Sequence, residues 1–392
     1  MTWEEIKHVN TADVFRDSVL VGKISRIDRG SAFEYDTNYL EGADRGGGIA
    51  FHLPHLRRRH ETSGVNLHTY FAGLLPEGLR LRALTKRMKT SEDDLLSLLI
   101  ATGGDCIGDV SVVPENQQPS KKAVPTVEVK NLRKVVFAEL FERSIDYDAT
   151  QSPEPESSIP GVQEKISAAT ISFPVKTKKT HGSFILKLNP PDKPRLVENE
   201  DFFLRMARAC GLEVPNAKLV RDRENNTGIL IERFDRILVP KDRTTLKVHQ
   251  EDACQFLNRY PSEKYRIKCS EIAEGLAEFC SSSSVETSRF IRLLAFSYLI
   301  GNGDLHAKNV SVQVKPDTNV VTMTPAYDLL TTLPYGDSRM ALQFEGRSDN
   351  FKRAYFVDFG ERYGVNRAMT QSILDEVCSQ SQCWVDRVGE IG

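Results

Sequence analysis

The chain has 392 residues, a length that predicts two or three packed domains. It is 40% hydrophobic and 27% charged, as globular proteins are, so a fibrous or disordered chain is excluded. The formal net charge of -2 excludes a polycation, and any contact with nucleic acid would have to be local or supplied by a partner.

The cysteines and the apolar stretches indicate the compartment. The 7 cysteines are scattered and form no C-x-x-C pair, which excludes a zinc cage or thiol redox motif of that pattern and fits a reducing compartment. The start, MTWEEIKHVN, lacks the regions of a signal peptide, and the most apolar stretch, 293–300, is too short to span a bilayer. We therefore expect a cytoplasmic protein that makes no contact with a membrane.

The first part of the chain is predicted to be rich in strands. Short alternating segments lie at 18–27 and 47–53. A helix is expected at 92–101, because Ser91 can cap its start and Gly103 can end it. The polar, proline-bearing run that follows residue 113 is typical of a linker or a long surface loop.

The middle and last parts change from strands to helices. Strands are predicted at 165–173 and 183–190, then a helix at 198–211 that Gly211 ends, then a hairpin whose turn is 225–228. Strands and one helix followed by a mostly helical half predict an α+β fold with two lobes, as in protein kinases. The remaining elements expected are helices at about 251–258, 270–281 and 286–301 and short strands at 310–314 and 320–325.

The segment GNGDLHAKNVSV (301–312) carries the sharpest chemical pattern. Asp304 is followed after four residues by Asn309. In a kinase catalytic loop this spacing lets the Asp accept the proton of the acceptor hydroxyl while the Asn holds a magnesium ion. The alternative is a polar loop that ends a helix, because D-x4-N also occurs by chance.

Asp328, in TPAYDLL, follows a short predicted strand and is the candidate for a second magnesium ligand. Mg²⁺ takes few carboxylates together with amide oxygens, water and substrate phosphates, and Asp328 and Asn309 offer such a set. The alternative is that Asp328 caps a helix formed by the leucines and threonines after it.

Two further segments are candidates for holding phosphates. The loop 157–168 contains a glycine turn whose backbone N–H groups can bind phosphate. Lys187 lies in the middle of a strand and can reach α- and β-phosphates, with Glu200 as its orienting partner. The alternatives are an edge-strand lysine in water and a first-turn acid favoured by the helix dipole.

Three more segments contain candidate contacts for ATP or DNA. Glu232 and Phe234 end an apolar strand and are predicted to form a hinge that binds adenine. His306 either orients its loop, contacts phosphate or is a hydrogen-bonded structural histidine. The basic run 52–60 is predicted to be a solvated face rather than a DNA contact.

Taken together, the segments resemble the HipA family, the kinase toxins of bacterial HipBA toxin–antitoxin modules. The resemblance implies a two-lobed, protein-kinase-like α+β fold with an N-terminal β-rich subdomain and a mostly helical C-terminal lobe. The resembling segments, in the family's order, are GLLPEGLR, GGDCIGDV, SIPGVQEK, FILKL, ENEDFFLRMARACGLEVP, ILIERFDR, HQEDACQ, GNGDLHAKNVSV and TPAYDLL.

The resemblance also implies residue roles. Asp304 matches the catalytic base, Asn309 and Asp328 match the magnesium ligands, and Ser158 matches a serine that the family autophosphorylates. The neighbouring Ser157 leaves the modified position open, and Pro160 departs from the small residue that many members carry. The residues implied to bind ATP are Ser158, Gly161, Val162, Gln163, Lys187, Glu232, Phe234, His306 and Lys308.

The function implied is that of a Ser/Thr protein kinase that uses ATP and Mg²⁺, phosphorylates an aminoacyl-tRNA synthetase, and so causes growth inhibition and persistence. A HipB-like helix-turn-helix antitoxin is the implied partner, and DNA is expected only through it. The alternatives are a small-molecule phosphotransferase of the aminoglycoside or choline kinase kind, and a pseudokinase scaffold. The domains expected are an N-terminal subdomain (1–113), a connecting segment (114–149), an ATP-binding region (150–236) and a helical lobe (237–392).

Overall fold

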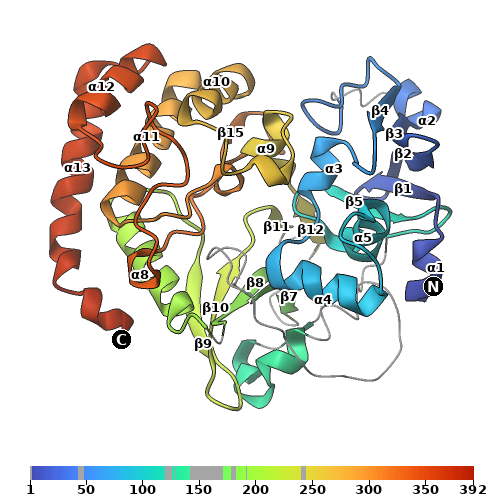
Figure 1. The fold of residues 1–392 in the computed structure, drawn as a ribbon, viewed down its shortest axis with the longest axis horizontal. Helices are drawn as coiled ribbons and strands as arrows, with labels where there is room; N and C mark the ends of the chain where they lie inside the picture. Colours follow the sequence, from blue (N-terminus) through green and yellow to red (C-terminus); the bar gives the residue numbers. More distant parts are fainter. Residues whose placement is uncertain are drawn as a thin grey trace.

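The structure is a computed structural model in which strands and helices form three adjoining parts (Figure 1). The predicted phosphate loop 157–168 and the first part of the predicted strand 165–173 lie outside the residues that the structure describes. Those residues are 2–42, 48–119, 126–127, 129–141, 171–177, 182–190, 192–239 and 244–392.

The N-terminal part is a five-stranded antiparallel sheet in the order β4-β3-β2-β1-β5, with helices packed on it. Apolar side chains alternate along its strands and bury a core that includes Phe33, Tyr35 and Phe71. Its strands are β1 (Thr11–Arg16), β2 (Val19–Ile27), β3 (Gly30–Tyr35), β4 (Arg59–Ser63) and β5 (Val110–Pro114). Its helices are α1 (Trp3–Lys7), α2 (Thr37–Glu41), α3 (Thr69–Gly73), α4 (Gly78–Met88) and α5 (Leu95–Thr102), followed by the 3-10 turn η1 (Gly103–Asp105).

The helix predicted at 92–101 begins later than expected. Its N-cap is Asp94 and not Ser91, because the Ser91 hydroxyl accepts the N–H of Asp93 and so stabilises a turn before the helix. Gly103 ends the α-helix as predicted, since the chain tightens there into η1.

The second sheet has the order β6-β7-β8-β10-β9. β6 (Thr126–Val127) comes from the segment predicted to be a connection and pairs in parallel with β7 (Ile171–Thr177), so that segment is partly built into the sheet. The other pairs are antiparallel, and the predicted hairpin is confirmed as β9 and β10. The remaining elements are η2 (Val129–Lys134), β8 (Ser183–Leu188), α8 (Leu196–Ala209), β9 (Ala217–Arg221) and β10 (Thr227–Glu232).

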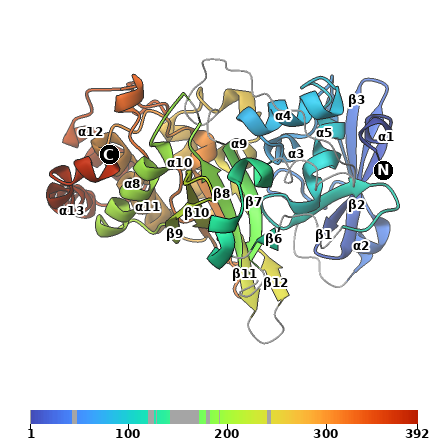
Figure 2. The ribbon, with the colours of Figure 1, turned by 90° about the horizontal axis from the view of Figure 1, so that it is seen from below.

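The second sheet lies between the N-terminal part and the C-terminal helices (Figures 1 and 2). Alternate residues of β10 face opposite sides. Leu230 packs into the core shared with the N-terminal part, whereas Ile229 and Ile231 pack into the core shared with α8 and the helical half. Each face of this sheet is therefore buried against a different part of the molecule.

The C-terminal part is mostly helical, as predicted. Among the described residues, no helix is long and apolar enough to cross a membrane. The strands are β11 (Arg236–Val239), β12 (Thr244–Lys247), β13 (Gln250–Asp252), β14 (Ser311–Val314) and β15 (Val321–Met323). The helices are α9 (Ala253–Phe256), α10 (Cys269–Phe279), α11 (Ser283–Leu299), α12 (Arg353–Arg362) and α13 (Arg367–Val385), with short 3-10 turns η3 (Pro261–Glu263), η4 (Ala307–Asn309), η5 (Leu333–Tyr335) and η6 (Val388–Ile391).

Candidate active site

A cavity of about 350 Å³ lies where the three parts meet. Its size is in the range of small-molecule sites. Residues far apart in the sequence form its walls, so the N-terminal part contributes to the same cavity as the second sheet and the helical half. The segments that line it are the α3–α4 connection (73–77), the turn after α5 (105–107), parts of β7, β8 and β10, the connection 232–235, and residues near 306–311 and 327–328.

Lys187 reaches the cavity from the middle of β8. It pairs across the sheet with Ile229, on the face that packs toward α8, so its side chain leaves the sheet on that side. Its Nζ lies 2.7 Å from Oε1 of Glu200, on α8, and also contacts the Asp328 carboxylate. The predicted partnership with Glu200 is therefore present, and the alternative of an edge-strand lysine in water is wrong, because Lys187 is on an inner strand.

The charges around Lys187 decide its protonation. Burial by itself would lower the pKa of Lys187, but Asp328 and Glu200 outweigh it and raise the pKa above its ordinary value. Burial raises the pKa of Glu200 to about 6 although Lys187 opposes the shift. The lysine is thus a fixed positive charge on the wall of the cavity.

Asp328 has a backbone conformation that few non-glycine residues adopt. Its φ is +55°, in the left-handed region, and its carbonyl accepts the side-chain N–H of Asn302 at 3.3 Å. No helix follows it, because the chain is irregular until η5, so the alternative of a helix cap is wrong. Such strain is found where the surrounding structure needs a particular side-chain direction. Here it accompanies a carboxylate that lines the cavity beside Lys187.

The predicted catalytic loop begins where α11 ends. Gly301 has a φ of +65° and lies against Leu333 so closely that a Cβ would be 2.6 Å from that side chain. The Asn302 side chain accepts the Asp304 N–H at 3.1 Å, and the Asn309 side chain donates to the Asp304 carbonyl at 3.0 Å. The two asparagines therefore hold the backbone on both sides of the Asp304 carboxyl group.

Asp304 itself is 5% exposed. The Tyr265 hydroxyl, from the connection that follows η3, donates to Asp304 Oδ1 at 3.2 Å. Neither Tyr265 nor Asn302 was predicted from the sequence. Asn302 could have been found, because it lies two residues before Asp304 in GNGD. Tyr265 lies far from Asp304 in the chain, and no local pattern pointed to it.

His306 is buried and lines the cavity. Within the described part of the chain, neither of its ring nitrogens has a hydrogen-bond partner, so the alternative of a hydrogen-bonded structural histidine is wrong. Burial and the charge of Lys264 lower the pKa of His306 to about 3, which keeps the imidazole neutral. An unpaired neutral imidazole on a cavity wall is suited to contact a ligand.

Lys308, which the resemblance implies to bind ATP, lines the cavity, but its ammonium group already has partners. Its Nζ donates to the Gly73 carbonyl at 3.0 Å and pairs with Glu77 at 3.1 Å and Asp252 at 3.4 Å. Two carboxylates already neutralise this ammonium group, so the structure gives Lys308 a role in joining the predicted catalytic loop to the N-terminal part. Glu77, which sequence reasoning missed, also contacts Lys264 at 2.5 Å.

The predicted adenine hinge also lines the cavity. Both Glu232, at the end of β10, and Phe234 line the cavity. The Glu232 carboxylate accepts a hydrogen bond from the Asn216 side chain. The ring of Phe234 lies 5.7 Å from that of Tyr327, a further residue that the sequence did not reveal. Two aromatic rings that line one cavity offer a flat apolar surface for a base.

A buried group of charges fastens this hinge to the N-terminal part. Arg233 and Arg236 each contact Asp105 of η1, at 2.7 and 2.9 Å, and each contacts Asp235. Their guanidinium groups also donate to the Cys106 carbonyl. The hinge and the turn after α5 therefore hold each other in place on one wall of the cavity.

The predicted magnesium ligands are compatible with a hard cation. The Asn309 amide uses its N–H group on the Asp304 carbonyl, and both Asn309 and Asp328 line the cavity. Among the described residues there is no group of three or more His, Cys, Asp or Glu side chains that could hold a metal ion. One carboxylate and one amide fit Mg²⁺, which is bound largely through water and substrate phosphates. Ser158, Gly161, Val162 and Gln163 lie outside the described residues.

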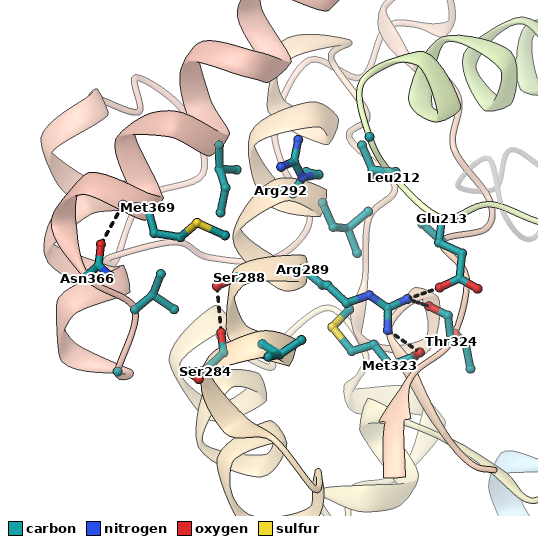
Figure 3. A pocket seen from close by; sticks show the side chains of 17 residues that line it. Leu212, Glu213, Ser284, Ser288, Arg289, Arg292, Met323, Thr324, Asn366 and Met369 are labelled. Atoms are coloured by element: carbon teal, nitrogen blue, oxygen red, sulfur yellow. Dashed lines mark hydrogen bonds and ion pairs between the residues drawn. The ribbon is translucent and has the colours of Figure 1, made fainter. Parts of the chain in front are cut away.

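A second cavity, of about 400 Å³, lies away from these groups between α11, α13 and the α8–β9 connection (Figure 3). Its arginines are already paired. Arg289 contacts Glu213 at 2.8 Å, and Arg292 contacts Glu376 at 2.7 Å (Figure 3 draws the first pair). Its lining includes neither Lys187 nor the loop with Asp304, so the chemistry expected from the sequence belongs to the first cavity.

The fold and the site together define a two-lobed, kinase-like protein. Comparison with known proteins gives the same class. The model of the HipA-like C-terminal domain matches residues 157–384, and that of the HipA N-terminal domain matches residues 12–113. The chain belongs to the HipA family, whose members include kinases, and the predicted α+β fold is confirmed.

Individual relatives are moderately similar. The Shewanella oneidensis Ser/Thr-protein kinase toxin HipA is 28% identical over 79% of this chain and 74% of its own. Two Sinorhizobium fredii proteins provisionally named as kinases are Y4mE, 27% identical over 86% of this chain and 82% of its own, and Y4dM, 32% identical over 70% and 65%. The solved Shewanella oneidensis HipA, in a complex with HipB and operator DNA, superposes with a TM-score of 0.75 at 20% identity, covering 97% of this chain and 91% of that one.

Proposed function

We propose that the chain is an ATP-dependent Ser/Thr protein kinase that acts as the toxin of a type II toxin–antitoxin module. The observation that carries the proposal is the convergence of Lys187, Glu200 and Asp328 on one cavity, next to the loop that holds Asp304. The similarity to the Shewanella oneidensis Ser/Thr-protein kinase toxin supports the choice of acceptor class.

Each group has a defined part in phosphoryl transfer. Lys187, kept charged by its carboxylate neighbours, binds the α- and β-phosphates of ATP, and the neutral His306 contacts a phosphate oxygen. Asn309 and Asp328 would hold Mg²⁺, which would supply positive charge against the phosphate oxygens.

Asp304 accepts the proton of the acceptor hydroxyl. The hydroxyl oxygen forms a bond to the γ-phosphorus while the bond from that phosphorus to the β–γ bridging oxygen breaks, and ADP leaves. The protein's main contribution is to position these groups and to fix charges around them, since phosphoryl transfer needs little covalent help. The adenine lies against the aromatic pair Phe234 and Tyr327, with the backbone near Glu232 along its edge.

The acceptor and the partner are further parts of the proposal. We expect an aminoacyl-tRNA synthetase as the phosphorylated protein, with inhibition of translation as the result. A HipB-like helix-turn-helix protein is the expected antitoxin, by analogy with the complex in which the Shewanella oneidensis HipA was solved. Since this chain has a formal net charge of -2, operator DNA should bind it only through that partner.

Autophosphorylation of Ser158 is the proposed off switch. A phosphate adds about -1.5 to -2 charges beside the nucleotide phosphates and would repel them. Intact-mass analysis tests it. Wild type purified from cells should carry an added phosphate, whereas Asp304→Asn and Ser158→Ala should not. A phosphate on Ser157 would keep the switch but move its position.

The main experiment incubates the purified chain with Mg²⁺, ATP labelled in its γ-phosphate, and a bacterial lysate. Label should enter a lysate protein with wild type and not with Asp304→Asn, and mass spectrometry should then identify the labelled protein. Label that enters only small molecules would favour the aminoglycoside or choline kinase alternative. The absence of any ATP turnover would favour a scaffold that only binds.

A further inference from the structure

Tyr265 contacts the group proposed to be the catalytic base without lining the cavity itself. Its hydroxyl donates to Asp304 Oδ1 at 3.2 Å. This hydrogen bond holds one oxygen of the carboxylate, so the orientation of Asp304 depends in part on where the phenol is held.

The phenol ring is fixed from two sides. The ring of His306 meets it edge-on, with centroids 5.1 Å apart and planes at 80°. The ammonium group of Lys264 lies 5.3 Å from its centroid, within the range of a cation–π contact. Lys264 is itself held at 2.5 Å by Glu77 of the N-terminal part.

The backbone around Tyr265 is tied to the loop that carries Asp304. The carbonyl of Lys264 accepts the N–H of Ala307 at 3.1 Å, and the turn at η3 is closed by the N–H of Arg266 bonding to Glu263 at 2.7 Å. The hydroxyl of Tyr265 and the carboxylate of Asp304 therefore belong to two segments that are joined by main-chain and side-chain contacts on adjacent residues.

We propose that Tyr265 is a positioning residue for phosphoryl transfer: its hydroxyl sets the direction of the Asp304 carboxylate toward the acceptor hydroxyl. This inference rests on the proposed function, because it assigns Tyr265 a role through Asp304. It does not involve Tyr265 in nucleotide binding, since Tyr265 is not among the residues that line the cavity, whereas Lys187, His306 and Asp328 are.

The test is Tyr265→Phe, which removes only the hydroxyl and keeps the ring between His306 and Lys264. The turnover number for phosphoryl transfer should fall roughly 10–100-fold, as is usual when a group that orients a functional side chain is lost. The KM for ATP, the melting temperature and the stabilisation by Mg²⁺-ATP should stay at wild-type values.

Tyr363→Phe is the matched control. Tyr363 also donates its hydroxyl to a carboxylate, Glu274 Oε1 at 3.3 Å, but on the exposed surface of the helical half. Wild-type turnover is expected for this variant. A Tyr265→Phe variant that matches it in turnover, or whose KM for ATP rises while its turnover number stays unchanged, would overturn the inference.

A double-mutant comparison shows whether Tyr265 acts through Asp304. In an Asp304→Asn background, the hydroxyl has no carboxylate to orient, so Tyr265→Phe should cause no further loss of the residual turnover measured with labelled ATP. The same fold-loss in both backgrounds would contradict the inference alone. Full turnover in Asp304→Asn by itself would instead contradict the proposed function.

Discussion

Asp304 is the residue on which most of the proposed chemistry depends. Its loop is short, and its backbone is held by Asn302 and Asn309 on either side, so a nearly isosteric change should leave the fold intact. Asp304→Asn removes the base and should lower turnover about 10²-fold or more. Labelled-ATP turnover measures this, with the melting temperature as the test of folding. Near wild-type turnover would contradict the assignment of the base.

Asp328 combines an unusual backbone with a candidate metal ligand. Asp328→Ala should abolish the rise in melting temperature that Mg²⁺-ATP causes in wild type, because stabilisation by a ligand follows RT ln(1 + [L]/Kd) and disappears when the site is lost. Differential scanning fluorimetry with and without Mg²⁺-ATP measures it.

The control for this variant is Asp17→Ala. Asp17 is exposed in the β1–β2 turn and has a φ of +54°, close to the +55° of Asp328, so it reports the backbone cost of alanine in the left-handed region without the cavity. The control should lose some stability and keep the full nucleotide-induced shift. If Asp328→Ala also keeps the shift, Asp328 is not a ligand.

At the scale of elements, β8 and β10 explain how one lysine comes to face the site. The period of two along β8 sends Leu186 and Leu188 into the core shared with the N-terminal part and sends Lys187 to the opposite face. On that face α8 offers Glu200. A shift of the strand register by one residue would bury the lysine among apolar side chains, so the pairing of β8 with β10 is a condition for the site.

The turn η1 and the hinge after β10 form the second arrangement at this scale. Asp105→Asn should weaken the buried cluster in which Arg233 and Arg236 each lose one charged partner. Breaking a buried ion pair costs about 3–5 kcal/mol, and Asp235 retains part of the compensation, so we expect a loss of ~3 kcal/mol in the free energy of unfolding.

Urea denaturation measures this loss. The control is Glu376→Gln, which breaks the exposed end of the pair with Arg292 and should cost less than about 1 kcal/mol. Equal effects of the two changes would show that the cluster does not fasten the hinge to the N-terminal part.

At the scale of the molecule, the features that could be predicted from the sequence are those that depend on residues close together in the chain. The order of strands and helices, the spacing of Asp304 and Asn309 and the strand lysine Lys187 were all legible, because each depends on neighbours within a few residues. The wrong alternatives had the same local basis. A helix after Asp328 was plausible from composition, but the chain there is irregular, and Leu329 packs into the core of the helical half.

Contacts between distant segments were not predictable from pattern. Glu77 and Asp105 are ordinary acidic residues in the sequence, and only the meeting of the three parts places them on Lys308 and the hinge arginines. Tyr265 and Tyr327 likewise carried no local signal. The division into domains at 113, 149 and 236 stays a prediction.

The junction of the parts also predicts a dependence of stability on pH. His249, on the approach to β13, lies 3.1 Å from both Asp109 of the N-terminal part and Glu251, while Arg16 contacts Asp109 from the other side. Burial would lower the pKa of His249, but the two carboxylates raise it to about 9.

Because the folded pKa lies above the unfolded value of about 6.5, the stability contributed by His249 is complete below pH 6.5 and is lost as the pH rises through 9. Melting temperatures of wild type and His249→Gln between pH 6 and pH 9.5 should therefore converge at the alkaline end. Two curves that stay parallel over this range would mean that the charge of His249 does not stabilise the junction.

Because the N-terminal part forms one wall of the cavity, the cavity can close only late in translation of the chain. Gly73 and Lys308 are hydrogen-bonded across 235 residues of chain, and Lys308 belongs to the loop that carries Asp304. A ribosome that adds about 5–20 residues per second needs roughly 10–50 s to make the second partner after the first. During that time the nascent chain has no closed cavity and no positioned base. A polypeptide still being translated would therefore be inert toward ATP, and activity would appear only on molecules that are nearly finished.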